Sequence, residues 1–172
     1  MSINLVIFYS RRGQNYVGGQ VVDLEKGNSE QIAEYISDAV NADTFEICTT
    51  KAYPEDYTAC TERAKKELRE NARPRLREYL DSLAGYENIF IVGPCWWGTY
   101  PMPVFSLLER LDFRNKRVMP VMTHEGSGMG SAEKDLKKFL KGAKIVKGVA
   151  IQGSKVSESE VFIKEWAVRN IR

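Results

Sequence analysis

Two adjacent tryptophans stand in a segment rich in glycine and proline, directly after an apolar run. Neighbouring side chains of a strand point to opposite faces, so we expect at least one indole to lie on the loop rather than in the core. A planar ligand stacked on that indole would explain its exposure; a loop that folds back and buries both rings is the alternative. The candidate ring-binding residues are Pro94, Cys95, Trp96, Trp97 and Gly98.

Ser10 and the pair Asn28 and Ser29 could together hold an anion. Ser10 follows an apolar run, and Asn28 and Ser29 open a helical pattern. Free N–H groups at a helix N-terminus, the positive end of the helix dipole and nearby hydroxyls favour a phosphate. The alternative is a helix cap beside a turn, because Asn and Ser are common caps. Neither GxxxxGK[ST] nor GxGxxG spacing is present.

A third segment combines glycines with small polar side chains after another apolar run. Its backbone amides could face the polar edge of a flat ligand. A lone histidine there is either part of that site or a structural hydrogen-bonding group. Its residues are Thr123, His124, Glu125, Gly126, Ser127 and Gly128. One loop for phosphate, one for a ring and one for the ring's edge describe a mononucleotide with a planar tricyclic head.

Strands and helices must alternate to position these loops. Apolar runs predict strands at residues 5–9, 44–48, 89–93, 118–123 and 146–151, and helical patterns fall at 28–40, 57–71, 103–111, 132–140 and 157–168. Continuously apolar strands need cover on both faces, which the helices supply, so we expect a parallel, doubly wound sheet. Ligands of such sheets bind beyond the carboxyl ends of the strands.

Two stretches depart from this alternation. Residues 14–27 alternate weakly between glycines, which is compatible with a hairpin inserted between a strand and its helix. The charged stretch at residues 67–78 has no clear place in the alternating pattern.

The 172 residues suit one domain, which we expect to span residues 1–172. The absence of any apolar run near about 20 residues, or of a signal-peptide pattern, predicts a cytoplasmic protein without a membrane partner. A net charge of +2, with basic residues spread among carboxylates, argues against nucleic acid. Three scattered cysteines and one histidine argue against disulfides and a metal site.

The order of these motifs resembles the flavodoxins, in particular the branch whose first loop is expanded. The resemblance rests on residues 6–11, 27–33, 93–98 and 123–128, with Pro101 and Pro103. It implies a three-layer α/β/α fold with a five-stranded parallel sheet in the order 2-1-3-4-5, and FMN bound without a covalent bond. In flavodoxins the FMN lies at the point where the order of the strands reverses.

The same resemblance implies roles for individual residues. Ser10, Arg12, Asn28 and Ser29 would bind the phosphate. Residues 94–98 would line one face of the isoalloxazine, and residues 123–128 would flank its other side. The chain departs from the strongly acidic electron carriers of the family, because it is slightly basic.

Three functions follow as hypotheses. In the first, the flavin transfers electrons to a redox partner protein while the polypeptide binds and tunes it. In the second, the protein is an NAD(P)H-dependent quinone or nitro reductase with a small-molecule partner. Such enzymes usually dimerise, so monomer and homodimer both stay open. In the third, the tryptophan loop belongs to a flavin-free binding module.

Overall fold

The computed structural model describes residues 2–172 and has a parallel β-sheet at its centre. The sheet order is β4, β1, β5 and β6, with β7 and β8 both paired to the far side of β6. The strands are β1 (Asn4–Phe8), β4 (Asp43–Glu46), β5 (Asn88–Pro94), β6 (Arg117–His124), β7 (Lys144–Ile145) and β8 (Val149–Gln152). All these pairs are parallel. The predicted order 2-1-3-4-5 is confirmed, with β7 and β8 sharing the fifth position.

The fifth strand is interrupted, whereas the sequence predicted one strand over residues 146–151. Val146 still donates to Val118 of β6, but Pro120, two residues further along the same edge, has no N–H to donate. Gly148 also approaches β6 closely, since a Cβ there would lie 2.8 Å from the Pro120 carbonyl oxygen. The missing donor and this close approach explain the break between β7 and β8.

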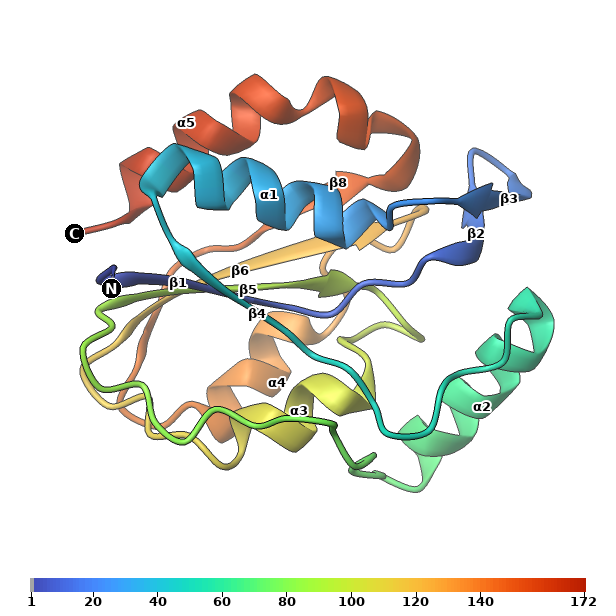
Figure 1. Cartoon of the computed structure of the whole chain (residues 1–172), viewed down its shortest axis with the longest axis horizontal. Coiled ribbons are helices and arrows are strands. Elements are labelled where there is room, and N and C mark those ends of the chain that lie inside the picture. The colour runs from blue at the N-terminus through green and yellow to red at the C-terminus, as the bar shows by residue number, and fades with distance from the viewer. Residues whose placement is uncertain (1) are drawn as a thin grey trace.

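Helices cover both faces of the sheet and make three layers (Figure 1). One face carries α1 (Asn28–Val40) and α5 (Glu160–Asn170), and the other carries α3 (Met102–Leu108) and α4 (Ala132–Phe139). A separate cluster of buried apolar residues lies on each face. In α1 the buried positions Ile32, Ala33, Ile36 and Val40 follow helical spacing, as the sequence predicted.

The last helix begins later than expected. The sequence predicted a helix over residues 157–168, but a 3₁₀ helix, η1 (Gly153–Glu158), comes first. Both the amide and the hydroxyl of Ser159 donate to the Val156 carbonyl oxygen. This local side-chain bond competes with the regular α-helical pattern, so α5 begins only at Glu160.

The insertion after β1 is a hairpin, as the weak alternation indicated. It consists of β2 (Gly13–Val17) and β3 (Gln20–Leu24) and forms a two-stranded sheet of its own. Gly18 and Gly19 have φ values of 63° and 89°, which is the geometry of a two-residue hairpin turn.

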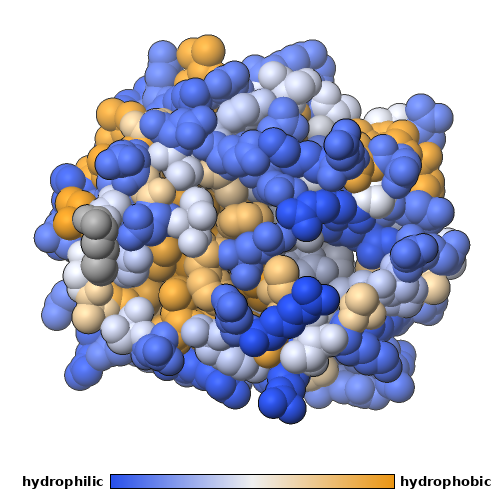
Figure 2. Space-filling view, viewed as in Figure 1, coloured by the Kyte–Doolittle hydropathy of each residue, from blue (hydrophilic) through white to orange (hydrophobic). Residues whose placement is uncertain are grey.

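The remaining α-helix, α2 (Tyr57–Arg69), lies beyond the carboxyl end of the sheet, near the hairpin (Figure 1). After it the charged stretch becomes extended, and Leu76 bridges to Thr49. In Figure 2, hydrophilic residues cover most of the same view, and apolar residues reach the surface over β4 at the sheet edge. No helix within residues 2–172 is long and apolar enough to cross a membrane.

Candidate functional site

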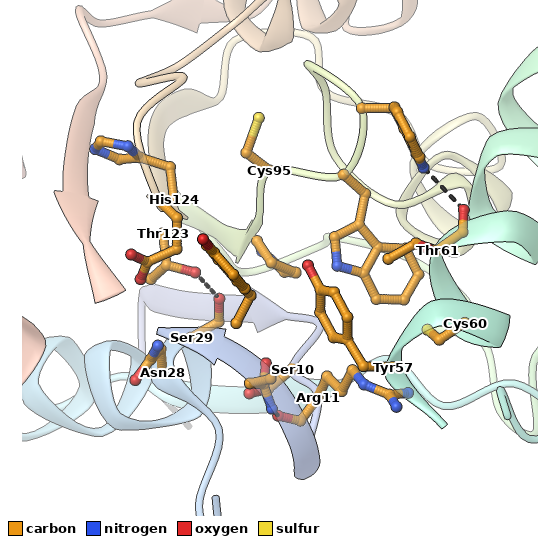
Figure 3. A pocket seen from close by; sticks show the side chains of 16 residues that line it. Ser10, Arg11, Asn28, Ser29, Tyr57, Cys60, Thr61, Cys95, Thr123 and His124 are labelled. Atoms are coloured by element: carbon orange, nitrogen blue, oxygen red, sulfur yellow. Dashed lines mark hydrogen bonds between the residues drawn. The ribbon is translucent and has the colours of Figure 1, made fainter. Parts of the chain in front are cut away.

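A cavity of about 340 Å³ opens where the carboxyl ends of β1, β5 and β6 meet (Figure 3). The chain leaves β1 for β4 on one side and returns to β5 on the other, so this is the point where strand order reverses. Small-molecule sites typically measure about 300–1,000 Å³. The lining residues are Ser10, Arg11, Asn15, Tyr16, Asn28, Ser29, Tyr57, Cys60, Thr61, Pro94, Cys95, Trp96, Trp97, Thr123, His124 and Glu125.

The loop after β1 and the start of α1 form one corner of the cavity. The Ser10 hydroxyl accepts from the Glu30 amide at 3.0 Å and so caps α1 in place of Gly27, the N-cap residue. Ser29 and Thr123 share a hydrogen bond of 2.8 Å between their hydroxyls. The amides of Asn28 and Ser29 lie in the first helical turn and have no acceptor within the helix. This corner therefore offers N–H and O–H groups to an anion.

Gly27 permits the close packing of this corner. A Cβ at Gly27 would lie 2.0 Å from the Ser10 hydroxyl oxygen and 2.7 Å from the Arg11 carbonyl oxygen. Any larger residue would push the first loop away from α1.

Arg12 does not line the cavity, although the resemblance to the flavodoxins implied that it binds the phosphate. Its guanidinium donates to both carboxylate oxygens of Glu30, at 3.0 and 2.8 Å, and lies 3.3 Å from Glu46. Arg11 lines the cavity instead. Its guanidinium donates to the carbonyl oxygens of Pro54 and Glu55, each at 2.9 Å, which joins the first loop to the segment before α2.

The tryptophan loop turns tightly between Trp96 and Thr99. The Trp96 amide donates to Thr99 at 2.8 Å, and Trp97 and Gly98 have φ values of 55° and 88°. Two positive φ values favour glycine, and a tryptophan there is uncommon. Gly98 itself does not line the cavity.

The two indoles have different environments. Trp96 is partly buried and packs edge-on against Tyr9 and Tyr53, with centroid distances of 5.2 and 5.0 Å. Trp97 is 50% exposed, and its indole N–H donates to the Thr61 carbonyl of α2 at 2.9 Å (Figure 3). One indole thus stands on the loop, as expected, and it connects the loop to α2.

The third loop contributes only its first residues to the cavity: Gly126, Ser127 and Gly128 lie outside the lining, whereas Thr123, His124 and Glu125 belong to it. The Ser127 hydroxyl donates to the Cys95 sulfur at 3.1 Å, so it supports the loop that carries a lining residue. His124 Nδ1 accepts from the Gly126 amide at 2.8 Å. A nitrogen that accepts carries no proton, which assigns the imidazole N–H to Nε2.

Glu125 connects this loop to the hairpin. One of its carboxylate oxygens accepts from the Gly18 amide at 3.2 Å. The other is buried and has no hydrogen-bond partner among residues 2–172. The hairpin turn is therefore held at the cavity rim by Glu125, which lies in the loop directly after β6.

Six lining residues were not identified as site residues from the sequence, and one of them is Arg11 of the first loop. Asn15 and Tyr16 come from the hairpin, and Tyr57, Cys60 and Thr61 come from α2. Burial raises the pKa of the Cys60 thiol and of the Tyr57 hydroxyl, so both side chains keep their protons near neutral pH. The sequence predicted the hairpin and the helix that carry the other five residues, but it did not indicate that either element lies against the cavity.

Comparison with known proteins agrees with the fold. Solved structures with the same fold include candidate flavoproteins from Bacteroides uniformis (28% identity, TM-score 0.73, covering 96% of this chain and 97% of that chain) and Bacteroides eggerthii (22%, 0.77, 98% and 98%). A flavoprotein from Lactobacillus acidophilus, in complex with FMN, is 19% identical with a TM-score of 0.64, covering 92% and 98%. No curated protein matches the sequence significantly. The family model described as flavodoxin matches residues 24–170, and the chain belongs to the flavodoxin family.

Proposed function

We propose that this protein binds FMN non-covalently in the cavity and carries electrons between redox partners. The observation that carries the proposal is that one cavity combines a helix N-terminus, two hydroxyls and two indoles at the point where strand order reverses. The complex of the Lactobacillus acidophilus flavoprotein with FMN supports this choice of ligand.

The residues present fit a phosphate at one end of the cavity. Ser10, Asn28 and Ser29 supply neutral donors, and α1 directs the positive end of its dipole toward them. The corner is shaped by backbone, since a Cβ on Gly27 would fill the space beside Ser10. A neutral, donor-rich corner of this kind suits an anionic group.

The other end fits an aromatic ring. Pro94, Cys95 and Trp96 line it with mainly apolar surface, and Trp96 is held edge-on by two tyrosines. These contacts restrain the Trp96 ring, so it can orient a planar ligand without losing further freedom. Bound FMN would supply one- and two-electron redox chemistry, and the polypeptide would supply its position and surroundings.

The cavity of a single copy of the chain would hold the mononucleotide alone, which is all that an electron carrier needs. At about 340 Å³ it lies near the lower end of the range for small-molecule sites. One mononucleotide would occupy most of it. Electrons would then pass through the exposed rim, where Trp97 is half exposed.

Visible absorption of the purified protein, before and after addition of FMN, tests the binding. Anaerobic titration with a reductant then tests the function. We expect a yellow protein with quenched tryptophan emission and reduction in two resolved one-electron steps. Rapid two-electron bleaching by NAD(P)H, with continued turnover when a quinone is added, would favour the reductase instead. A protein that stays colourless with FMN would contradict the proposal entirely.

A matched pair of serine variants locates the site. Ser29→Ala removes a hydroxyl from the cavity corner, whereas Ser37→Ala removes one from the far end of the same helix. We expect the first to weaken FMN binding about three- to tenfold and the second to leave it unchanged.

A further inference from the structure

Helix α2 supplies a wall of the cavity that the loops after the strands do not. Tyr57, Cys60 and Thr61 occupy one face of its first turns and all line the cavity. This wall is joined to the tryptophan loop, because the Trp97 indole donates to the Thr61 carbonyl at 2.9 Å. The wall and the proposed ring-binding loop therefore form one continuous surface.

The Tyr57 side chain points from α2 into the cavity (Figure 3). Its hydroxyl makes no hydrogen bond to any residue in the described part of the chain, 2–172. Burial raises its pKa, so the group stays an O–H that can donate and accept. A half-buried phenol directed into a cavity needs a partner there, which is either water or a ligand.

A second tyrosine supports the first. The rings of Tyr16 and Tyr57 lie 6.1 Å apart at 30° to each other. The Tyr57 amide donates to the Gln14 side chain at 2.7 Å, and Glu125 holds the turn of the same hairpin. These hydrogen bonds hold the hairpin against α2 and against the loop after β6, which brings the two rings together at the cavity rim.

The pair lies away from the phosphate corner. In Figure 3, Tyr57 and Thr61 stand on one side of the cavity, and Asn28, Ser29 and Thr123 stand on the other. A planar ligand head that reaches toward the tryptophan loop would meet the Tyr57 hydroxyl, whereas a phosphate at α1 would meet the hydroxyls of Ser10 and Ser29.

We infer that Tyr57 is a cofactor-binding residue whose hydroxyl hydrogen-bonds a polar atom of the flavin ring, with Tyr16 packed against it as the outer part of the same wall. This inference rests on the proposed function and deepens it. It adds a residue from α2 to the flavin site, where the sequence motifs point only to the loops after β1, β5 and β6.

Binding of three ligands that contain the same isoalloxazine ring can distinguish a contact to the ring from a contact to the phosphate. FMN carries both ribityl chain and phosphate, riboflavin lacks the phosphate, and lumiflavin keeps only the ring. Dissociation constants for all three are measured with wild type, Tyr57→Phe and Tyr57→Ala. Tyr35→Phe is the matched control, because it removes a phenol hydroxyl from α1 outside the cavity.

We expect Tyr57→Phe to weaken all three ligands by the same factor, about five- to tenfold. Tyr57→Ala should weaken them further, since it also removes the ring that packs on Tyr16, and Tyr35→Phe should have no effect. Equal affinities of wild type and Tyr57→Phe would overturn the inference, and so would a loss confined to FMN. If wild type binds none of the three ligands, the proposed function fails, and this inference fails with it.

Discussion

Asp135 of α4 accepts a hydrogen bond of 2.7 Å from the Thr99 hydroxyl in the tryptophan loop. The same carboxylate oxygen accepts from the Ser131 hydroxyl at 2.8 Å. Ser131 in turn donates its amide to the Gly98 carbonyl at 2.7 Å. One helix carboxylate thus holds the tryptophan loop and the glycine-rich loop together, through residues that do not line the cavity.

Replacing Asp135 by alanine should loosen both loops. Two hydroxyl donors would lose their acceptor, which we expect to lower the free energy of unfolding by about 1–3 kcal/mol, measured by urea denaturation. We also expect FMN to bind several-fold more weakly. Lys138→Ala is the control, since its ammonium lies 3.8 Å from Asp135 in an exposed ion pair, which contributes about 0–1 kcal/mol. Equal effects of the two variants would show that charge, rather than the hydrogen bonds, matters.

Gly130 is expected to tolerate alanine much less well than Gly128. Both residues have positive φ, 52° and 62°, so both substitutions strain the backbone. Only at Gly130 would the new Cβ collide with backbone, at 2.1 Å from the Gly98 carbonyl oxygen. We expect Gly128→Ala to lower the unfolding free energy by about 1 kcal/mol and Gly130→Ala by at least about 1 kcal/mol more. Similar thermal midpoints for the two variants would contradict the close loop contact.

Gly27→Ala should reduce discrimination between FMN and riboflavin. The backbone of Gly27 is in an ordinary extended conformation, with φ −66°, so alanine causes no dihedral strain. Its Cβ would instead displace Ser10 from the start of α1. If this corner binds the phosphate, FMN affinity falls about tenfold or more while riboflavin affinity changes little. Isothermal titration with both ligands measures the ratio, and an unchanged ratio would place the phosphate elsewhere.

Apolar periodicity and turn residues are local signals, so the strands, the helices and the positions of the three loops could be predicted from the sequence. The order of the strands was implied only by the resemblance to the flavodoxins, because strand pairing joins residues that are remote in the sequence. The sequence did not indicate which of Arg11 and Arg12 lines the cavity. Adjacent side chains point in different directions, and the choice depends on Glu30 of α1 and on the Pro54 carbonyl, which are remote in the sequence. The wall formed by α2 was missed for the same reason. The pattern predicted a helix, but nothing local indicates where a helix lies relative to a sheet edge.

The break in the fifth strand also depended on a remote residue. The apolar run at residues 146–151 has the pattern of a continuous strand, but Gly148 within it approaches Pro120 of β6, which lacks an N–H. Such pairing becomes visible only once the register between strands is known.

Buried tyrosines should make the fold sensitive to alkaline pH. Burial raises the pKa of Tyr100 well above its ordinary value of 10.0, and Tyr9 and Tyr53 behave in the same way. Above about pH 10 the unfolded chain therefore binds fewer protons than the folded chain. The stabilisation is fully present below that pH and is lost as the pH rises, by up to about 1.4 kcal/mol per pH unit for each tyrosine.

Tyr100 gives the clearest test of this dependence. Its ring is fully buried, and its hydroxyl donates toward the carbonyl oxygens of Ile91 and Val121 at 2.9 and 3.0 Å. Tyr100→Phe should lower stability at pH 7 because two carbonyls lose this donor. It should also reduce the slope with which the unfolding free energy falls between pH 9.5 and about 11.5. The reduction is at most the contribution of one tyrosine, about 1.4 kcal/mol per pH unit. A Tyr100→Phe slope equal to that of wild type would mean that Tyr100 ionises as readily in the folded state as in the unfolded chain.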